Sequence, residues 1–216
     1  MKRFVLLCLI TMFAFSGCAW FQTEEEKTSQ ELINEGMDQY NDEHYKDAIA
    51  SFEKLKDWYP FSQYAILAEL KLGDAYYHLE EYEDAIAAYE DFESLHPRNE
   101  AIPYVIYQIG LCYYDRIDTI DRDQSTAHKA LETFERLRKQ FPKDPYSIKA
   151  EQNIKKCQKS LAEHDLYVGL FYYKSRHYKA ALQRFIKVLT NYPDVGVHQR
   201  RFNILSSVRR RSKKQW

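Results

Sequence analysis

A four-fold internal repeat is the feature of this sequence that most restricts its fold. A glycine marks each copy, at Gly36, Gly73, Gly110 and Gly169. In the first, second and fourth copies a tyrosine follows the glycine by nine residues, and an alanine, an aromatic residue and a proline follow it by 12, 16 and 24 residues. In the third copy the last three positions keep their spacing but lie eight residues further on, which indicates an insertion at 115–126. Units of this kind bury their apolar faces only against neighbours, so the pattern predicts a stacked array.

The residue types at the repeated positions have physical reasons. Glycine and alanine are small enough for two helices to cross closely, the aromatic side chain fills the space beside them, and proline ends the second helix because it lacks a backbone N–H. These offsets resemble the tetratricopeptide (TPR) signature, which implies antiparallel helical hairpins. The residues predicted to hold the hairpins together are Gly36, Ala48, Phe52, Pro60, Gly73, Ala85, Tyr89, Pro97, Gly110, Ala130, Phe134, Pro142, Gly169, Ala181, Phe185 and Pro193.

The predicted fold is therefore all-α, a TPR α-solenoid with four complete repeats and a fifth that is truncated or atypical. Six glycines and six prolines in 216 residues suit long helices. The repeat array is expected over 28–193, followed by a basic tail or partial helix at 194–216. The expected helices lie near 28–41, 45–57, 62–79, 82–95, 100–115, 125–140, 145–174 and 178–190, in hairpin order.

The N-terminal residues have the pattern of an export signal. Two basic residues precede an apolar run from Phe4 to Phe15, and Ser16-Gly17 leads into Cys18. A run of this length is typical of a secretory leader and is short for a membrane span. The ending resembles the bacterial lipobox, which implies a signal peptide at 1–17 and a diacylglycerol, with an N-acyl chain, on Cys18. Residues 18–27 would then form a lipidated tether; an ordinary leader with a chance cysteine is the alternative.

The sequence shows no motif of catalytic chemistry. It has no glycine-rich phosphate loop, no Gly-x-Ser-x-Gly elbow, no His-Glu-x-x-His and no paired Cys-x-x-Cys. The segment 163–165 combines Glu, His and Asp, but adjacent residues on a helix point apart, so we interpret it as a solvated face. The acidic loop at 118–123 lacks the glycine and closing glutamate of a calcium loop. We predict no metal, no cofactor besides the lipid, and no enzyme activity; Cys112 and Cys157 are expected to be unpaired, with a disulfide left open.

The concave face of the array is the candidate binding surface. In a TPR array the first helices of the hairpins line a groove suited to a peptide or a partner helix. Tyrosines there give contact area at low entropic cost and suit an aromatic-rich peptide. For each tyrosine, packing between repeats is an equally good alternative. Counting from the repeated glycines, the candidate peptide-binding residues are Tyr40, Asn41, Asp74, Tyr77, His78, Tyr107, Tyr114 and Asp115.

A lipobox followed by TPR units, with Trp58-Tyr59-Pro60-Phe61-Ser62 closing the first, resembles the BamD (ComL) family of outer-membrane β-barrel assembly lipoproteins. The segment 162–168 is similar to part of the long first helix in the family's fourth hairpin. The resemblance implies a lipid-anchored scaffold at the outer membrane, facing the periplasm, and Ala19 agrees with that membrane because aspartate there retains many lipoproteins at the inner one. The implied partners are unfolded outer-membrane proteins at 28–115, the POTRA domains of a BamA-like barrel subunit from about 145 onward, and accessory lipoproteins.

The C-terminal segment departs from the family pattern, which continues with a full fifth hairpin. Here 197–216 is rich in arginine and lysine. Such a tail suits anionic partners, but we expect no nucleic acid, and membrane contact through the lipid anchor only. The alternative function is an envelope TPR adaptor of the Tol/peptidoglycan coordination type. That class has similar Tyr-Pro closings but carries an N-terminal coiled coil, for which 19–30 is too short.

Overall fold

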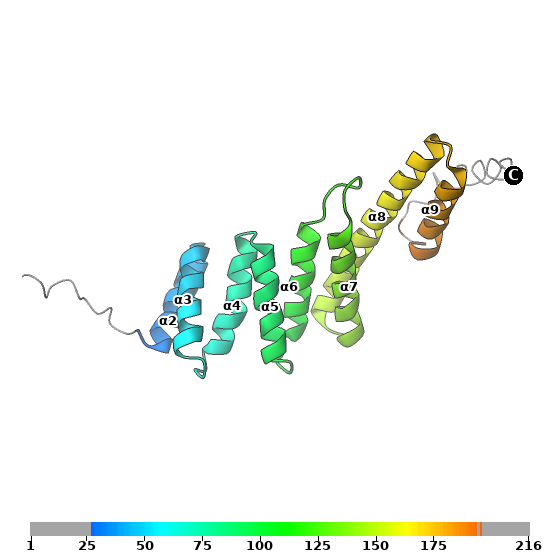
Figure 1. Cartoon of the computed structure of the whole chain (residues 1–216). Coiled ribbons are helices and arrows are strands. Elements are labelled where there is room, and N and C mark those ends of the chain that lie inside the picture. The colour runs from blue at the N-terminus through cyan, green and yellow to red at the C-terminus, as the bar shows by residue number, and fades with distance from the viewer. Residues whose placement is uncertain (1–26, 194, 196–216) are drawn as a thin grey trace, which may run out of the picture.

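The computed structural model describes residues 27–193 and 195, and these residues form eight α-helices and no strand. The helices stand side by side as antiparallel hairpins in chain order (Figure 1). The predicted all-α TPR solenoid is confirmed for the four repeats; a fifth repeat, the leader with Cys18, most of the tether and nearly all of 194–216 lie outside the described residues. The helices are α2 (Ser29–Asn41), α3 (Tyr45–Trp58), α4 (Ala65–His78), α5 (Tyr82–Leu95), α6 (Ile102–Asp115), α7 (Ser125–Gln140), α8 (Pro145–Lys174) and α9 (Tyr178–Asn191).

Most helix boundaries lie within one residue of those expected, but α4 and α6 begin later. After Pro60 the chain makes a turn in which the Ser62 N–H donates to the Tyr59 carbonyl and the Ala65 N–H to the Ser62 carbonyl. Before α6, the Asn99 side chain accepts a hydrogen bond from the Ala101 N–H at 2.8 Å. Serine and asparagine offer the backbone such local bonds in place of helical ones, which delays the helix start.

Each repeated glycine lies directly against the repeated aromatic ring of its own hairpin. A Cβ added to Gly36 would lie 2.5 Å from the Phe52 ring, and one added to Gly73 would lie 2.5 Å from the Tyr89 ring. The same holds for Gly110 with Phe134, and for Gly169 with Phe185 at 2.6 Å. No real Cβ fits at such distances, so only glycine lets the paired helices approach this closely. The close crossing predicted from the sequence is thus confirmed in all four hairpins.

Three of the four hairpin turns share one backbone geometry. Glu43, Glu80 and Arg176 each stand seven residues after the repeated glycine and have positive φ angles of 62°, 60° and 64°. In each, this residue and the next donate backbone hydrogen bonds to carbonyls of the last helical turn, the arrangement of a Schellman motif. The third turn instead holds the insertion, where the buried Gln124 side chain donates to the carbonyls of Thr119 and Arg122.

Helix α8 has 30 residues and belongs to two hairpins. It begins after Asp144, whose side chain accepts a hydrogen bond from the Tyr146 N–H at 2.8 Å, with Pro145 in the first turn, as the sequence predicted. Its first half packs into the large core between α4 and α8, and its second half carries Gly169 and packs against α9. The α8–α9 hairpin therefore extends beyond the row formed by α2 to α7 (Figure 1).

The buried residues form two larger and two smaller clusters. One larger cluster joins α2, α3 and α4, and the other joins α5, α6, α7 and the first half of α8. The second half of α8 and α9 contribute only small clusters, around Leu161 and Val188 and around Ala181 and Phe185. Cys112 and Cys157 are both buried and free, and burial raises the pKa of each thiol to about 12. Among the described helices, none is both long and apolar enough to cross a membrane.

Candidate partner-binding surfaces

The contacts between the helices indicate which side of the third and fourth hairpins is the inner one. Besides the contacts within and between consecutive hairpins, α6 also contacts α8, whereas no two second helices make a comparable contact among the described ones. The side on which alternate helices come closer is the concave side of a curved stack. This contact puts α6 and α8 on the inner side, and the continuation of the groove along α2 and α4 stays a prediction from the repeat pattern.

The fourth residue after the repeated glycine is a tyrosine in every hairpin, and in three of them it packs within its own repeat. Tyr40 meets Tyr45 edge to face, with ring centroids 5.4 Å apart, and Tyr77 meets Tyr82 in the same way at 5.8 Å. Tyr173 and Tyr178 repeat this geometry at 5.7 Å in the fourth hairpin. These pairs fix the rings at the edge of the molecule where each first helix turns into the second.

The first two of these pairs join into one surface, which we call the tyrosine row: Tyr40, Tyr45, Tyr77, His78, Tyr82 and Asp115. The exposed His78 ring stacks on Tyr45 at 4.7 Å with 5° between the planes, and its centroid lies 5.7 Å from that of Tyr40. The Tyr77 hydroxyl donates to the Asp115 carboxylate at 2.6 Å, which reaches the third hairpin. Burial, and then this hydrogen bond, raise the pKa of Tyr77, so its phenol stays neutral.

Of the eight predicted groove residues, Asp74 is in the wrong place. Its side chain is 3% exposed, and its Oδ1 accepts hydrogen bonds from the hydroxyls of Tyr89 at 2.7 Å and Tyr104 at 2.6 Å. Lys71 pairs with the other oxygen at 2.8 Å. Because it is buried and bonded to side chains of α4, α5 and α6, Asp74 joins these helices rather than facing a partner. Burial first, and the Asp74 charge second, raise the pKa of both phenols.

The remaining groove tyrosines are partly used in packing. Tyr107 is half-buried between hairpins, with its ring centroid 5.8 Å from that of Phe134 and 5.5 Å from that of Tyr146. Tyr114 is half-buried, and the Lys156 ammonium lies over its ring at 5.8 Å. The alternative of packing between repeats therefore holds for Tyr107, whereas Asn41, His78 and Asp115 are exposed at the helix ends.

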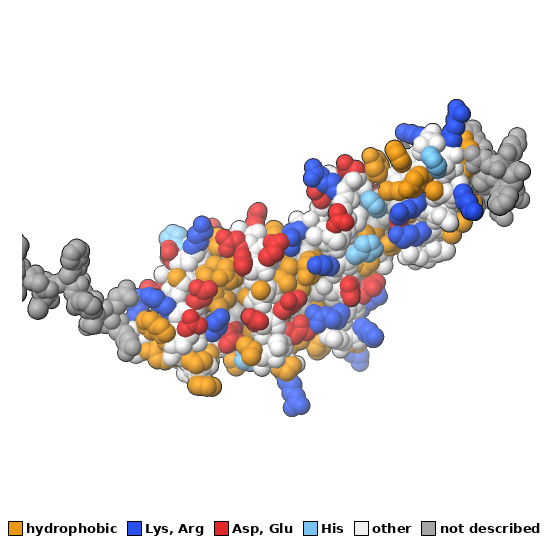
Figure 2. Space-filling model, in the orientation of Figure 1, with side chains coloured by type: hydrophobic (Ala, Val, Ile, Leu, Met, Phe, Trp, Pro, Cys, Tyr) orange, Lys and Arg blue, Asp and Glu red, His pale blue; other side chains and the backbone are white. Residues whose placement is uncertain are grey.

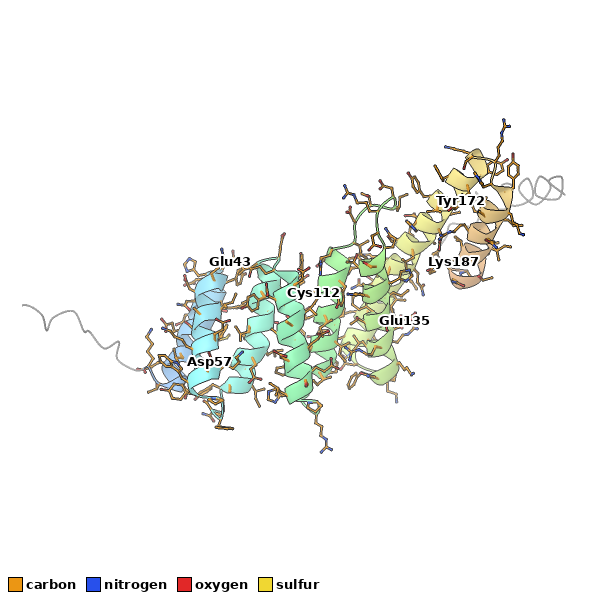
Figure 3. All side chains as sticks on the ribbon, in the orientation of Figure 1. Glu43, Asp57, Cys112, Glu135, Tyr172 and Lys187 are labelled. Atoms are coloured by element: carbon orange, nitrogen blue, oxygen red, sulfur yellow. The ribbon has the colours of Figure 1, made fainter. Side chains whose placement is uncertain are left out.

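The fourth hairpin carries a second kind of surface. Tyr167, Phe171 and Ile186 on α8 and α9 are 49%, 64% and 46% exposed. In the same hairpin Asp165 is 2% exposed and pairs with Arg184 at 2.7 Å and Lys187 at 2.8 Å (Lys187 is labelled in Figure 3). Our interpretation of 163–165 as a solvated face was therefore wrong for Asp165. Its two cationic partners lie on the following helix, so the sequence around Asp165 does not indicate that this carboxylate is paired.

The described residues hold no cluster of three His, Cys, Asp or Glu side chains placed to bind a metal. His164 of the 163–165 segment uses its Nδ1 against the Ile120 carbonyl, 2.7 Å away, and so fixes the inserted loop to α8. Stacked helical hairpins closed by four glycine–aromatic crossings define a protein of the TPR class.

Comparison with known proteins identifies its family. The family model YfiO, described as an outer membrane lipoprotein, matches residues 25–214. Outer membrane protein assembly factor BamD of Pasteurella multocida is 29% identical over 204 residues, covering 90% of this chain and 78% of that protein. BamD of Vibrio cholerae is 27% identical over 215 residues, covering 94% and 89%. The chain therefore belongs to the YfiO/BamD family of outer-membrane lipoproteins, which confirms the resemblance seen in the sequence.

A solved structure of a thermophilic TPR protein from Thermus thermophilus is similar at a TM-score of 0.45 and 16% identity. The match covers 84% of this chain and 98% of the Thermus protein. The fold assignment rests instead on the four glycine–aromatic crossings described above.

Proposed function

We propose that this protein is a lipid-anchored scaffold of outer-membrane β-barrel assembly, facing the periplasm. The observation that carries the proposal is the family match over 25–214, together with relatives that are assembly factors. Membership of this family associates the chain with the outer membrane, and the lipobox ending at Cys18 supplies a means of attachment by diacylglycerol and N-acyl chains.

The tyrosine row supports binding of unfolded outer-membrane proteins. Its rings are held in place by one another before any partner arrives, so little side-chain entropy is lost on binding. Exposed His78, Asn41 and Asp115 offer hydrogen-bonding groups beside the ring edges. An extended chain segment that alternates apolar and polar side chains and carries aromatic residues near its ends has matching groups, and such segments are typical of membrane β-strands.

The fourth hairpin supports binding of the POTRA domains of a BamA-like barrel subunit. Large apolar side chains exposed as a group on one hairpin mark a protein interaction surface. Phe171, at 64% exposure, lies close in sequence to Tyr167 and Leu170, which are 49% and 36% exposed. The surrounding charges are basic, with Lys174, Arg176 and Lys179 at the turn, which favours an acidic rim on the partner.

Affinity purification of the tagged protein from detergent-solubilised membranes tests this function. We expect the parent protein to recover a large β-barrel subunit and accessory lipoproteins. The substitution Phe171→Asp should reduce recovery of the barrel subunit roughly tenfold or more, because a carboxylate in an apolar contact loses its hydration.

The matched control is Leu67→Asp, since Leu67 is also an exposed apolar residue, at 40%, but lies on α4, outside the fourth hairpin. It should leave recovery of the barrel subunit unchanged. Equal losses in the two variants would contradict the placement of the partner on the fourth hairpin. Recovery of cell-wall synthases in place of a barrel subunit would support the envelope adaptor of the Tol/peptidoglycan type instead.

A further inference from the structure

The two long edges of the first three hairpins differ in charge. The turn edge consists of the connections from first to second helices, residues 42–47, 79–84 and 115–124, and it holds eleven Asp or Glu against three Lys or Arg. The loop edge consists of the helix ends and connections from second to first helices, residues 54–66, 94–102 and 138–149, and it holds seven Lys or Arg against three Asp or Glu. The two edges are opposite each other in Figure 1, and Figure 3 labels Glu43 on the first and Asp57 near the second.

The loop edge also gathers exposed apolar side chains. Phe61 is fully exposed at the tip of the α3–α4 loop, and Trp58 beside it is 47% exposed. Leu95 and Ile148 are 64% and 62% exposed at the next two loops of the same edge. Hydrophobic side chains gather at the lower left of the space-filling view, where the α3–α4 loop lies (Figure 2). Single exposed apolar residues are ordinary, but a series along one edge, ending in a bare phenylalanine, indicates a contact surface.

Basic and aromatic residues alternate within this edge. The Lys54 ammonium lies 5.7 Å from the centroid of the Trp58 ring, and Lys56 follows on the same helix end. Tryptophan and phenylalanine beside lysine and arginine are the composition of membrane interfaces, where the ring enters the acyl boundary and the cation meets lipid phosphate.

The described chain begins at this same edge. The Tyr59 hydroxyl donates a hydrogen bond to the Lys27 carbonyl at 2.9 Å, so the first described residue is fixed beside the α3–α4 loop. Nine residue steps separate Cys18 from Lys27, and a chain of that length spans at most roughly 30 Å. A lipid on Cys18 therefore keeps the loop edge within reach of the bilayer.

We propose that the loop edge of the first three hairpins lies on the membrane surface, with Trp58 and Phe61 inserted among the lipid headgroups and the basic residues against anionic phospholipid. This inference rests on the proposed anchor at Cys18 and extends it, because it adds a protein surface to a membrane contact that we expected from the lipid alone. The acidic turn edge then points away from the bilayer, as repulsion from anionic headgroups requires.

Tryptophan fluorescence in vesicles tests the contact on the full lipidated chain. In the variant Trp20→Phe/Trp216→Phe, Trp58 is the only tryptophan. After reconstitution into phosphatidylethanolamine–phosphatidylglycerol vesicles that contain brominated lipid, we expect strong quenching of Trp58 emission. Adding Phe61→Asp should lower the quenched fraction roughly twofold or more, since a carboxylate resists entry into the acyl region.

The matched reporter carries Trp58→Phe and Glu81→Trp, which moves the single tryptophan to the turn edge, and it should remain unquenched. Equal quenching of the two reporters overturns the proposed orientation. Flotation and palmitate labelling of the same preparations test the anchor separately. A protein that carries palmitate and floats but leaves Trp58 unquenched overturns the membrane contact alone, whereas equal palmitate labelling of the parent and Cys18→Ser removes the anchor.

Discussion

The first three hairpins and the fourth are built on one repeat pattern but are stabilised differently. In the first three, every hairpin packs against another, and the aromatic rings opposite the glycines are completely buried. In the fourth, the pair Gly169 and Phe185 is preserved while the surrounding cluster is small and large apolar side chains remain exposed. The repeat signature therefore specifies how one hairpin closes, whereas its stability depends on how much buried core surrounds the crossing.

The two buried carboxylates show the same difference. Asp74 receives hydroxyl donors from α5 and α6 as well as a lysine from its own helix, so it joins successive hairpins. Asp165 receives its two cations from α9 alone, within a single hairpin. Loss of the Asp165 pairs would therefore loosen the fourth hairpin, whereas loss of the Asp74 bonds would loosen the contact between the second and third hairpins.

The largest effect is expected from overpacking a glycine crossing. Gly73→Leu should lower the free energy of unfolding by about 3 kcal/mol or more, because the Tyr89 ring is fully buried and its hydroxyl is bonded to Asp74. Gly169→Leu should cost only about 1 kcal/mol, since Phe185 lies in a small cluster and can shift. Urea denaturation followed by circular dichroism measures both. Equal costs would show that neighbouring hairpins add nothing to the rigidity of the crossing.

A smaller difference is expected at the buried carboxylates. Asp74→Ala should destabilise by about 2 kcal/mol, because it removes the carboxylate that accepts the hydrogen bonds of the buried Tyr89 hydroxyl and of the Tyr104 hydroxyl. Asp165→Ala should cost about 1 kcal/mol or less, since the side chains of Arg184 and Lys187 are 38% and 42% exposed and water can solvate them. Thermal melts of the two variants compare the sites, and a larger loss for Asp165→Ala would reverse the assignment of which region is better buried.

The smallest effects should be the same in both regions. Glu80→Gly and Arg176→Gly should each stabilise by about 0.5 kcal/mol, because their positive φ angles strain a side chain but not glycine. The control is Glu81→Gly, whose φ of −81° gives glycine no advantage and which should be neutral or destabilising. The denaturation midpoints of these three variants, compared with that of the parent protein, measure the effect. A stabilisation confined to one region would mean that the turn geometry is set by its surroundings rather than locally.

The sequence predicted the hairpins well because each one is determined by local residues. Small and aromatic positions at fixed offsets specified the crossing of Gly36 with Phe52 and its three equivalents, and Pro145 after Asp144 specified the start of α8. What the sequence did not reveal depends on residues distant along the chain. Asp74 looked like a groove residue until Tyr104, thirty positions later, was found to donate to it, and the partners of Asp165 stand on the next helix.

The unbroken length of α8 has a mechanical consequence. One half of this helix is set in the core of the third hairpin, and the other half holds α9, so the two ends must tilt as one rod. A helix of 30 residues is roughly 45 Å long, and a tilt of about 5° about its first residue sweeps its far end through roughly 4 Å. A tilt of the first half of α8, which is set in the core with α6 and α7, would therefore carry the C-terminal hairpin with it.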